Sequence, residues 1–167
     1  YLLKLYLRMS FSERSHHLIK KVSDILIRKK KSLAIAESCT GGKIASLITS
    51  FPGSSLYFNG GIVAYNNSIK INQLGVDLVD LKKYSAVSDK VAIQMANKIR
   101  NKFSADLSIS TTGYAGPDGN KVGQVFIGFS TSEKEYVKEF LFKGSRLDII
   151  DESVYQSLSI LVSKIKK

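Results

Sequence analysis

Three adjacent residues, Ser38, Cys39 and Thr40, carry hydroxyl and thiol groups and are followed directly by two glycines. The mostly small or apolar residues 33–37 are typical of a short buried strand, and apolar residues recur at helical spacing over 44–48. The three side chains therefore lie where a strand turns into a helix, whose first N–H groups have no intrahelical partner. A hydroxyl there either caps the helix or acts as a nucleophile beside donors that stabilise an anion. Residue types alone leave both interpretations open.

A serine nucleophile in this chain needs a base other than the usual histidine. The two histidines, His16 and His17, lie near the start of an expected surface helix and are interpreted as solvent-facing. Lys70 is the candidate base, because it follows a β-rich segment and falls in the first turn of a short helix, where the dipole disfavours a cation and lowers a lysine pKa. Tyr65 could relay or orient the proton. The competing nucleophile is Cys39, whose thiolate a helix N-terminus also favours, although a packed, unreactive cysteine is the simpler interpretation.

A glycine-rich loop from Gly113 to Gly119 follows a second expected strand, residues 107–112. The carboxyl ends of strands are where open α/β sheets bind ligands. Other common sites are excluded: CTGGKI lacks the first glycine and the final Ser or Thr of a phosphate-binding P-loop, and the chain has no GxGxxG motif. A single cysteine rules out an intramolecular disulfide and a cysteine-rich zinc cluster. Neither a metal nor a cofactor is expected.

The composition indicates one globular domain of 167 residues with a net charge of +11. Lysines gather at the expected helix ends, where cations complement the dipole, so we interpret the basic face as solvated and nucleic-acid binding as unlikely. No stretch approaches the roughly 18 apolar residues of a membrane span. The single cysteine suits a reducing cytoplasm. We treat residues 1–10 as an extension of uncertain role, with Met9 as a candidate start.

The order of the expected elements indicates how the reactive residues are positioned. Alternating strands and helices, followed by a hairpin and a last helix, predict a three-layer α/β/α sandwich with a mixed, mostly parallel sheet of about five strands. Paired glycines at 60–61 indicate a bulge or a close backbone approach. Residues 76–87 are interpreted as a polar connection, and Ser145 with Asp148 resembles a capping box. The expected helices are 12–29, 41–50, 69–74, 88–102 and one after 145, and the expected strands are 33–37, the second half of 56–65, 107–112, 124–131 and 135–142.

Four segments at compatible spacing resemble a known family. They are AESCTGG (36–42), GGIVAYNNSIK (60–70), AVS (86–88) and TTGYAGPDG (111–119). Together they are similar to the C-terminal domain of the CinA competence/damage-inducible proteins, which as a stand-alone chain is the nicotinamide mononucleotide amidohydrolase. The likeness covers residues 14–163 and implies a single domain of this kind over residues 11–167.

The resemblance implies hydrolysis of the carboxamide of nicotinamide mononucleotide to nicotinate mononucleotide and ammonia, in pyridine-nucleotide salvage. It implies that Ser38 is the nucleophile and Lys70 the base, with Tyr65 connecting them. We expect the first N–H groups of the helix at Gly41–Gly42 to stabilise the oxyanion. The implied partners are a small-molecule nucleotide and, since family members usually associate, a second copy of the chain. The implied substrate-binding residues are Thr40, Gly41, Gly42, Thr112, Gly113, Gly116 and Arg146.

The sequence departs from the family at two points on the phosphate and ribose side. The stretch after Pro117 is shorter than usual, and Ile150 stands where the family tends to have a second arginine. These departures favour a first alternative, a catalytically silent CinA-like module that binds a nucleotide or a protein. The second alternative is nucleic-acid binding through the lysine-rich face, and a binding constant that falls steeply with salt would be its signature.

Overall fold

The computed structural model describes residues 10–166, and the expectations for residues 1–9 lie outside this range. Its centre is a mixed sheet of five strands in the order β2-β1-β3-β4-β5. The central strand β1 pairs in parallel with β2 and β3, whereas β4 pairs antiparallel with β3 and β5. The mixed sheet expected from the sequence is therefore confirmed. The strands are β1 (Leu33–Glu37), β2 (Phe58–Val63), β3 (Leu107–Gly113), β4 (Gln124–Thr131) and β5 (Glu135–Leu141).

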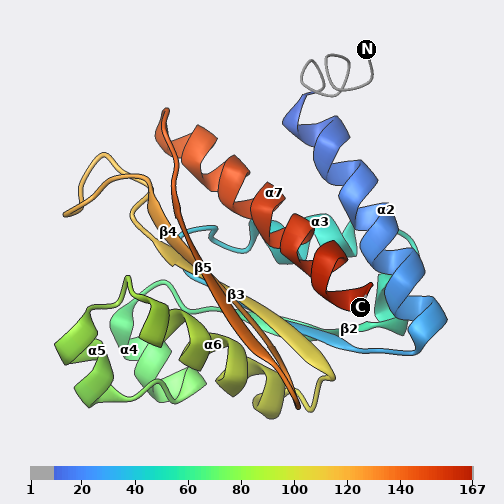
Figure 1. The fold of residues 1–167 in the computed structure, drawn as a ribbon, viewed down its shortest axis with the longest axis horizontal. Helices are drawn as coiled ribbons and strands as arrows, with labels where there is room; N and C mark the ends of the chain where they lie inside the picture. The colour runs from blue at the N-terminus through green and yellow to red at the C-terminus, as the bar shows by residue number, and fades with distance from the viewer. Residues whose placement is uncertain (1–9, 167) are drawn as a thin grey trace.

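Helices cover both faces of the sheet and complete the three layers (Figure 1). The helices α2, α3 and α7 pack on one face, and α6 packs on the other together with the shorter α4 and α5. A 3-10 turn, η1 (Ser54–Leu56), leads into β2, and a π-helical turn, η2 (Lys70–Leu74), follows α4. The helices are α2 (Phe11–Lys29), α3 (Lys43–Thr49), α4 (Asn67–Ile69), α5 (Leu78–Tyr84), α6 (Asp89–Lys102) and α7 (Arg146–Ile165).

The alternation of side chains along β1 explains why two separate cores form. Leu33 and Ile35 point into the larger apolar cluster beneath α2, α3 and α7. Ala34 and Ala36 point into the smaller cluster beneath α6. All five β1 residues are buried, because a strand covered on both faces has no solvent side.

Small residues bring α6 close to the sheet. The hydroxyls of Ser108 and Ser110 on β3 donate to the α6 carbonyls of Ala96 (2.7 Å) and Ala92 (2.6 Å). On β4, a Cβ atom added at Gly128 would lie 2.6 Å from the Ala92 carbonyl oxygen. These hydroxyls are buried, but each is hydrogen-bonded, so neither pays the desolvation cost of an unpaired polar group.

Two local features test the sequence interpretation. The bulge expected at Gly60–Gly61 is confirmed, because the register between β1 and β2 shifts so that Ala34 pairs with Gly60. The polar connection expected over 76–87 is wrong, since helix α5 occupies its centre. Asp77 caps this helix by accepting the N–H groups of residues 79 and 80, and Leu81 is its one buried residue. A helix with a single buried apolar position shows no periodic pattern in the sequence.

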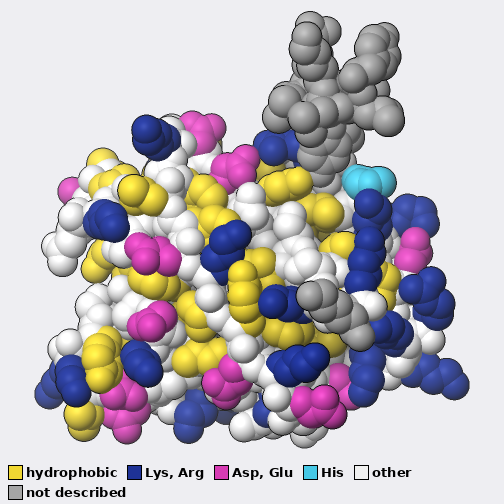
Figure 2. All heavy atoms as spheres, viewed as in Figure 1, with side chains coloured by type: hydrophobic (Ala, Val, Ile, Leu, Met, Phe, Trp, Pro, Cys, Tyr) yellow, Lys and Arg dark blue, Asp and Glu magenta, His cyan; other side chains and the backbone are white. Residues whose placement is uncertain are grey.

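Basic side chains gather over α2 and the end of α7, as Figure 2 shows. Arg28 and Lys29 lie in the last turn of α2, Lys164 in that of α7, and Arg100 and Lys102 in that of α6. Cations at a helix C-terminus offset the negative end of its dipole. The expectation that the basic runs lie at helix ends is confirmed.

Candidate active site

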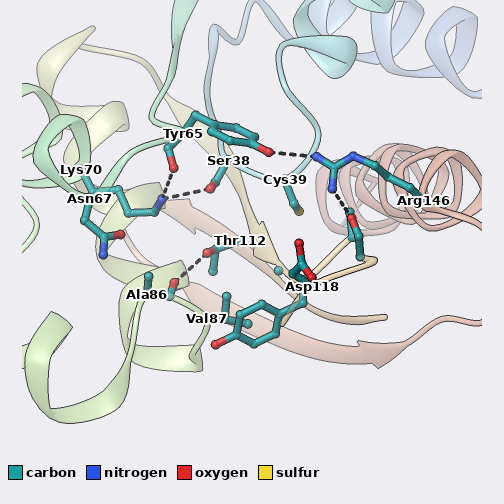
Figure 3. A pocket seen from close by; sticks show the side chains of 14 residues that line it. Ser38, Cys39, Tyr65, Asn67, Lys70, Ala86, Val87, Thr112, Asp118 and Arg146 are labelled. Carbon is teal, nitrogen blue, oxygen red and sulfur yellow. Dashed lines mark hydrogen bonds between the residues drawn. The ribbon is translucent and has the colours of Figure 1, made fainter. Parts of the chain in front are cut away.

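The carboxyl ends of the three parallel strands meet at one edge of the sheet and supply the candidate site. Ser38 follows β1, Ala64 and Tyr65 follow β2, and Thr112 and Gly113 are the last two residues of β3. The chain leaves β1 for β2 on one side and returns to β3 on the other, so this edge is a topological switch point, where such sheets bind ligands. A cavity of about 240 Å³ opens there, and the sequence-predicted residues that line it are Ser38, Tyr65, Lys70, Thr112, Gly113, Gly116 and Arg146 (Figure 3).

Ser38 and Lys70 are in direct contact. Lys70 Nζ donates a hydrogen bond to Ser38 Oγ at 2.9 Å (Figure 3). Both residues are buried, with 7% of Ser38 and 2% of Lys70 exposed. They lie 32 residues apart in the sequence: Ser38 follows β1, and Lys70 begins η2 after β2, the strand that pairs in parallel with β1. A hydroxyl within hydrogen-bond reach of a buried amine has the geometry of a nucleophile and its base.

Two backbone carbonyls fix the orientation of the Lys70 amine. Nζ also donates to the carbonyl oxygens of Ala64 at 2.7 Å and Tyr65 at 3.3 Å. An ammonium group has three N–H donors, so the three acceptors use all of them. Burial lowers the Lys70 pKa from 10.5 to about 8, opposed in part by the Cys39 thiol. A lysine with this pKa is partly neutral near pH 7 and can accept a proton.

The buried carboxylate of Glu37 occupies the start of α3. Its oxygens accept the N–H groups of Gly42 (3.1 Å), Ile44 (3.1 Å) and Ala45 (2.9 Å). These are the orphan donors of the helix, and they are already bonded. The expectation that the helix start at Gly41–Gly42 supplies oxyanion donors is therefore wrong for this conformation.

Thr40, Gly41 and Gly42 are expected from the resemblance to bind substrate, but their positions do not support this. None of the three is among the described residues that line it. The Thr40 hydroxyl lies 2.8 Å from that of Thr111 in the interior. Gly41 and Gly42 instead adopt positive φ angles of 60° and 96°, which glycine permits. These angles bring the chain around so that the Gly42 N–H reaches Glu37.

The residues directly after the nucleophile supply other donors. The N–H groups of Cys39 and Thr40 make no hydrogen bond to another residue within the described part of the chain. The Cys39 side chain is buried, and burial raises the pKa of its thiol to about 12. Cys39 thus remains a thiol near neutral pH, in agreement with the interpretation of it as packed and unreactive.

The Tyr65 hydroxyl lies away from the Ser38–Lys70 pair. It accepts a hydrogen bond at 2.8 Å from Arg146 Nη2, and the other terminal nitrogen of Arg146 donates to the carbonyl of Gly116 (Figure 3). The expected connection of Ser38 to Lys70 through Tyr65 is not formed, because the two atoms touch directly. Tyr65 contributes its backbone carbonyl to Lys70 and its hydroxyl to Arg146.

Residues to which the sequence interpretation assigned no role also line the cavity. Thr112 donates to the carbonyl of Ala86 at 2.6 Å, which brings Ala86 and Val87 to the cavity wall. Tyr114 and Asp118 line the cavity from the glycine loop, and Asn67 lines it from α4. Asp118 lies within the glycine loop that is expected to bind ligand, but only Thr112, Gly113 and Gly116 of that segment are expected to contact the substrate.

Comparison with known proteins identifies the family. The model of the family described as the CinA C-terminal domain matches residues 15–165. The chain belongs to this family. Solved structures agree with this CinA C-terminal domain: a CinA superfamily protein from Escherichia coli has a TM-score of 0.89 and 30% identity, covering 94% of each chain. The competence/damage inducible protein CihA from Agrobacterium tumefaciens has a TM-score of 0.89 and 29% identity, covering 92% of this chain and 96% of its own.

Curated relatives of this CinA C-terminal domain are longer proteins. A CinA-like protein of Desulfotalea psychrophila is 46% identical over 144 residues, which are 84% of this chain and 35% of that protein. A CinA-like protein of Amoebophilus asiaticus is 41% identical over 149 residues, 87% of this chain and 36% of its own length. The chain therefore spans about a third of these relatives.

Two further properties of residues 10–166 bear on the kind of site. No three His, Cys, Asp or Glu side chains in this range are grouped so that they could hold a metal ion. None of its helices combines the length and the apolar character needed to cross a bilayer.

Proposed function

We propose that this CinA C-terminal domain hydrolyses the carboxamide of nicotinamide mononucleotide to nicotinate mononucleotide and ammonia. The observation that carries the proposal is the 2.9 Å contact between Lys70 Nζ and Ser38 Oγ at the wall of a cavity. A hydroxyl paired with an amine of lowered pKa is suited to acyl transfer from an amide. The family resemblance supplies the substrate.

Proton transfer to Lys70 begins the reaction. When Lys70 is neutral, two N–H groups still donate to the carbonyls of Ala64 and Tyr65. The nitrogen lone pair then faces Ser38 Oγ, and the hydroxyl donates to it. Because the two carbonyls fix the amine, this lone pair needs no reorientation before it accepts the proton.

Ser38 Oγ then forms a bond to the amide carbon, and negative charge develops on the amide oxygen. The N–H group of Cys39, a residue that lines the cavity, is the available donor for this oxyanion, and such a donor is worth roughly 10²- to 10³-fold in rate. Collapse of the intermediate breaks the C–N bond, and the Lys70 ammonium protonates the departing ammonia. Neutral Lys70 then takes a proton from water, which attacks the acyl ester and releases the acid product.

Arg146 and the glycine loop are proposed to hold the nucleotide part of the substrate. The guanidinium group lines the cavity and is bonded to neutral partners, the Tyr65 hydroxyl and the Gly116 carbonyl. A phosphate is a stronger acceptor than either of them, and the planar guanidinium fork suits its oxygens. We further propose that the chain acts on a cytoplasmic nucleotide pool and associates with a second copy of itself.

The test is ammonia release from nicotinamide mononucleotide by the purified chain. Ser38→Ala and Lys70→Ala are each expected to lower kcat by at least about 10²-fold. The nucleophile and its base act as a pair, so the loss of either one removes the function of both. Ser55→Ala and Lys98→Ala, exposed residues outside the cavity, serve as matched controls and are expected to retain activity. Circular dichroism confirms that each variant is folded.

Two outcomes would contradict the proposal. If the Ser38→Ala chain keeps its activity, another residue is the nucleophile, and Cys39 is the next candidate. A folded wild-type chain that binds nicotinamide mononucleotide in calorimetry without releasing ammonia would instead support the silent binding module.

A further inference from the structure

Three charged side chains line the cavity, and one of them is a carboxylate. Lys70 and Arg146 are basic, and Asp118 is acidic. Arg146 is held by Tyr65 and Gly116, and Lys70 acts in its neutral form in the proposed reaction. Asp118 forms no hydrogen bond or ion pair with any other residue of the described range. Its negative charge is therefore available to a ligand.

The glycine loop holds Asp118 in place through its backbone. The N–H of Tyr114 donates to the Gln124 carbonyl at 2.9 Å, and the N–H of Gly123 donates to the Tyr114 carbonyl at 2.8 Å, so these two bonds close the loop at its base. Gly119, next to Asp118, packs on the Tyr114 ring, where an added Cβ would lie 2.6 Å from the ring. The loop thus presents Asp118 on the side of the cavity where the Gly116 carbonyl holds Arg146 (Figure 3).

We propose that Asp118 recognises the positive charge of the pyridinium ring, so that the site selects an amide carried on a cationic ring that also bears a phosphate. The inference rests on the proposed function, because it concerns the ring of that substrate. Asp118 and Arg146 then give the cavity opposite charges for the two oppositely charged parts of one ligand. A neutral aromatic amide would gain nothing from Asp118.

The size of the cavity sets the scale of the interaction between Asp118 and the ring. A sphere of the observed 240 Å³ is about 8 Å across, so a ring with its amide at Ser38 lies within about one Debye length of Asp118 at physiological salt. Asp118 is exposed, and solvent weakens the attraction. For unit charges about 5–6 Å apart in such surroundings, the expected preference for a cationic over a neutral ring is about 3- to 10-fold in Kd.

A matched pair of ligands isolates the ring charge. Oxidised nicotinamide mononucleotide has a pyridinium ring, and its reduced form has a neutral dihydropyridine ring with the same carboxamide, ribose and phosphate. Calorimetry at pH 9, where most of the Lys70 amine is neutral because burial lowers its pKa to about 8, would measure both Kd values on the Ser38→Ala chain, which does not turn over substrate. The same measurement would be made on that chain with Asp118→Asn, Asp118→Glu or Glu133→Gln added. Glu133 lies in the turn between β4 and β5 at the opposite end of the sheet, so it controls for the loss of one negative charge.

The expected result is a 3- to 10-fold preference of the Ser38→Ala chain for the oxidised ligand that decreases with added salt. Asp118→Asn should abolish this preference while leaving the Kd of the reduced ligand unchanged, and Asp118→Glu and Glu133→Gln should keep it. The inference is overturned if the Asp118→Asn chain keeps the preference. It is also overturned if this substitution raises the Kd of both ligands equally, which would indicate a contact to the ribose. It is also overturned if neither ligand binds.

Failure of the proposed function gives a different pattern. A wild-type chain that binds with the expected charge preference but releases no ammonia refutes the amidase and leaves the role of Asp118 intact. Ammonia release with no effect of Asp118→Asn on the preference refutes the inference alone.

Discussion

The rate of amide hydrolysis is expected to rise with pH as the Lys70 ammonium loses its proton. Burial lowers the pKa of Lys70 to about 8, so about one-tenth of the chains hold it neutral at pH 7 and about nine-tenths at pH 9. The value of kcat/KM should therefore rise about fivefold from pH 7 to 8 and about tenfold from pH 7 to 9. With its ordinary pKa of 10.5, only about one lysine in 3,000 would be neutral at pH 7, so burial increases the base form about 300-fold.

The assay is the initial rate of ammonia release below KM, between pH 6.5 and 9 at constant ionic strength. The range starts above the second pKa of a phosphate monoester, about 6, and the Cys39 thiol, with a pKa raised by burial to about 12, does not titrate within it. Lys70→Arg keeps the cation but cannot lose its proton, so it should be inactive throughout. A flat profile, or a rate that still rises tenfold per pH unit up to pH 9, would refute Lys70 as a base of lowered pKa.

Two further substitutions test the surroundings of the pair. Glu37→Gln should lower the free energy of unfolding by about 1–3 kcal/mol, because an amide NH₂ would face N–H groups that now donate to the carboxylate; urea unfolding measures it, and an unchanged midpoint would contradict this role. Tyr65→Phe should raise KM a few-fold and leave kcat within about twofold, because the hydroxyl bonds to Arg146 and not to Ser38. A fall in kcat of about 10²-fold would instead indicate that Tyr65 transfers the proton.

Strong local signals allowed much of the fold to be predicted. Periodic apolar residues marked α6 and α7, and the capping box of Ser145 and Asp148 is present in the structure. The hairpin expected from the neighbouring strands 124–131 and 135–142 is present as the antiparallel pair β4 and β5. Each signal depends on residues close together in the sequence, where propensity and hydrogen bonding decide the outcome locally. The short helix α5 gave no such signal.

The details of the site depend on side-chain directions that spacing does not determine. The order of strands brings residue 38 near residue 70, but the contact of Lys70 with Ser38 needs the π-helical turn η2 that begins at Lys70. The direction of Tyr65 depends on Arg146, 81 residues away. The position of Asp118 depends on the packing of Gly119 against Tyr114. Such long-range choices follow from tertiary packing and are not encoded in a local pattern.

Glu37 links the choice of nucleophile to the choice of oxyanion donors. Its carboxylate bonds three N–H groups at the start of α3, so the positive end of that helix is already neutralised. A helix N-terminus would otherwise favour a Cys39 thiolate. Burial is the main reason that the Cys39 pKa rises, and the Glu37 charge raises it further. In the proposed reaction, the same carboxylate therefore disfavours the competing nucleophile and leaves the oxyanion to the N–H group of Cys39, directly beside Ser38.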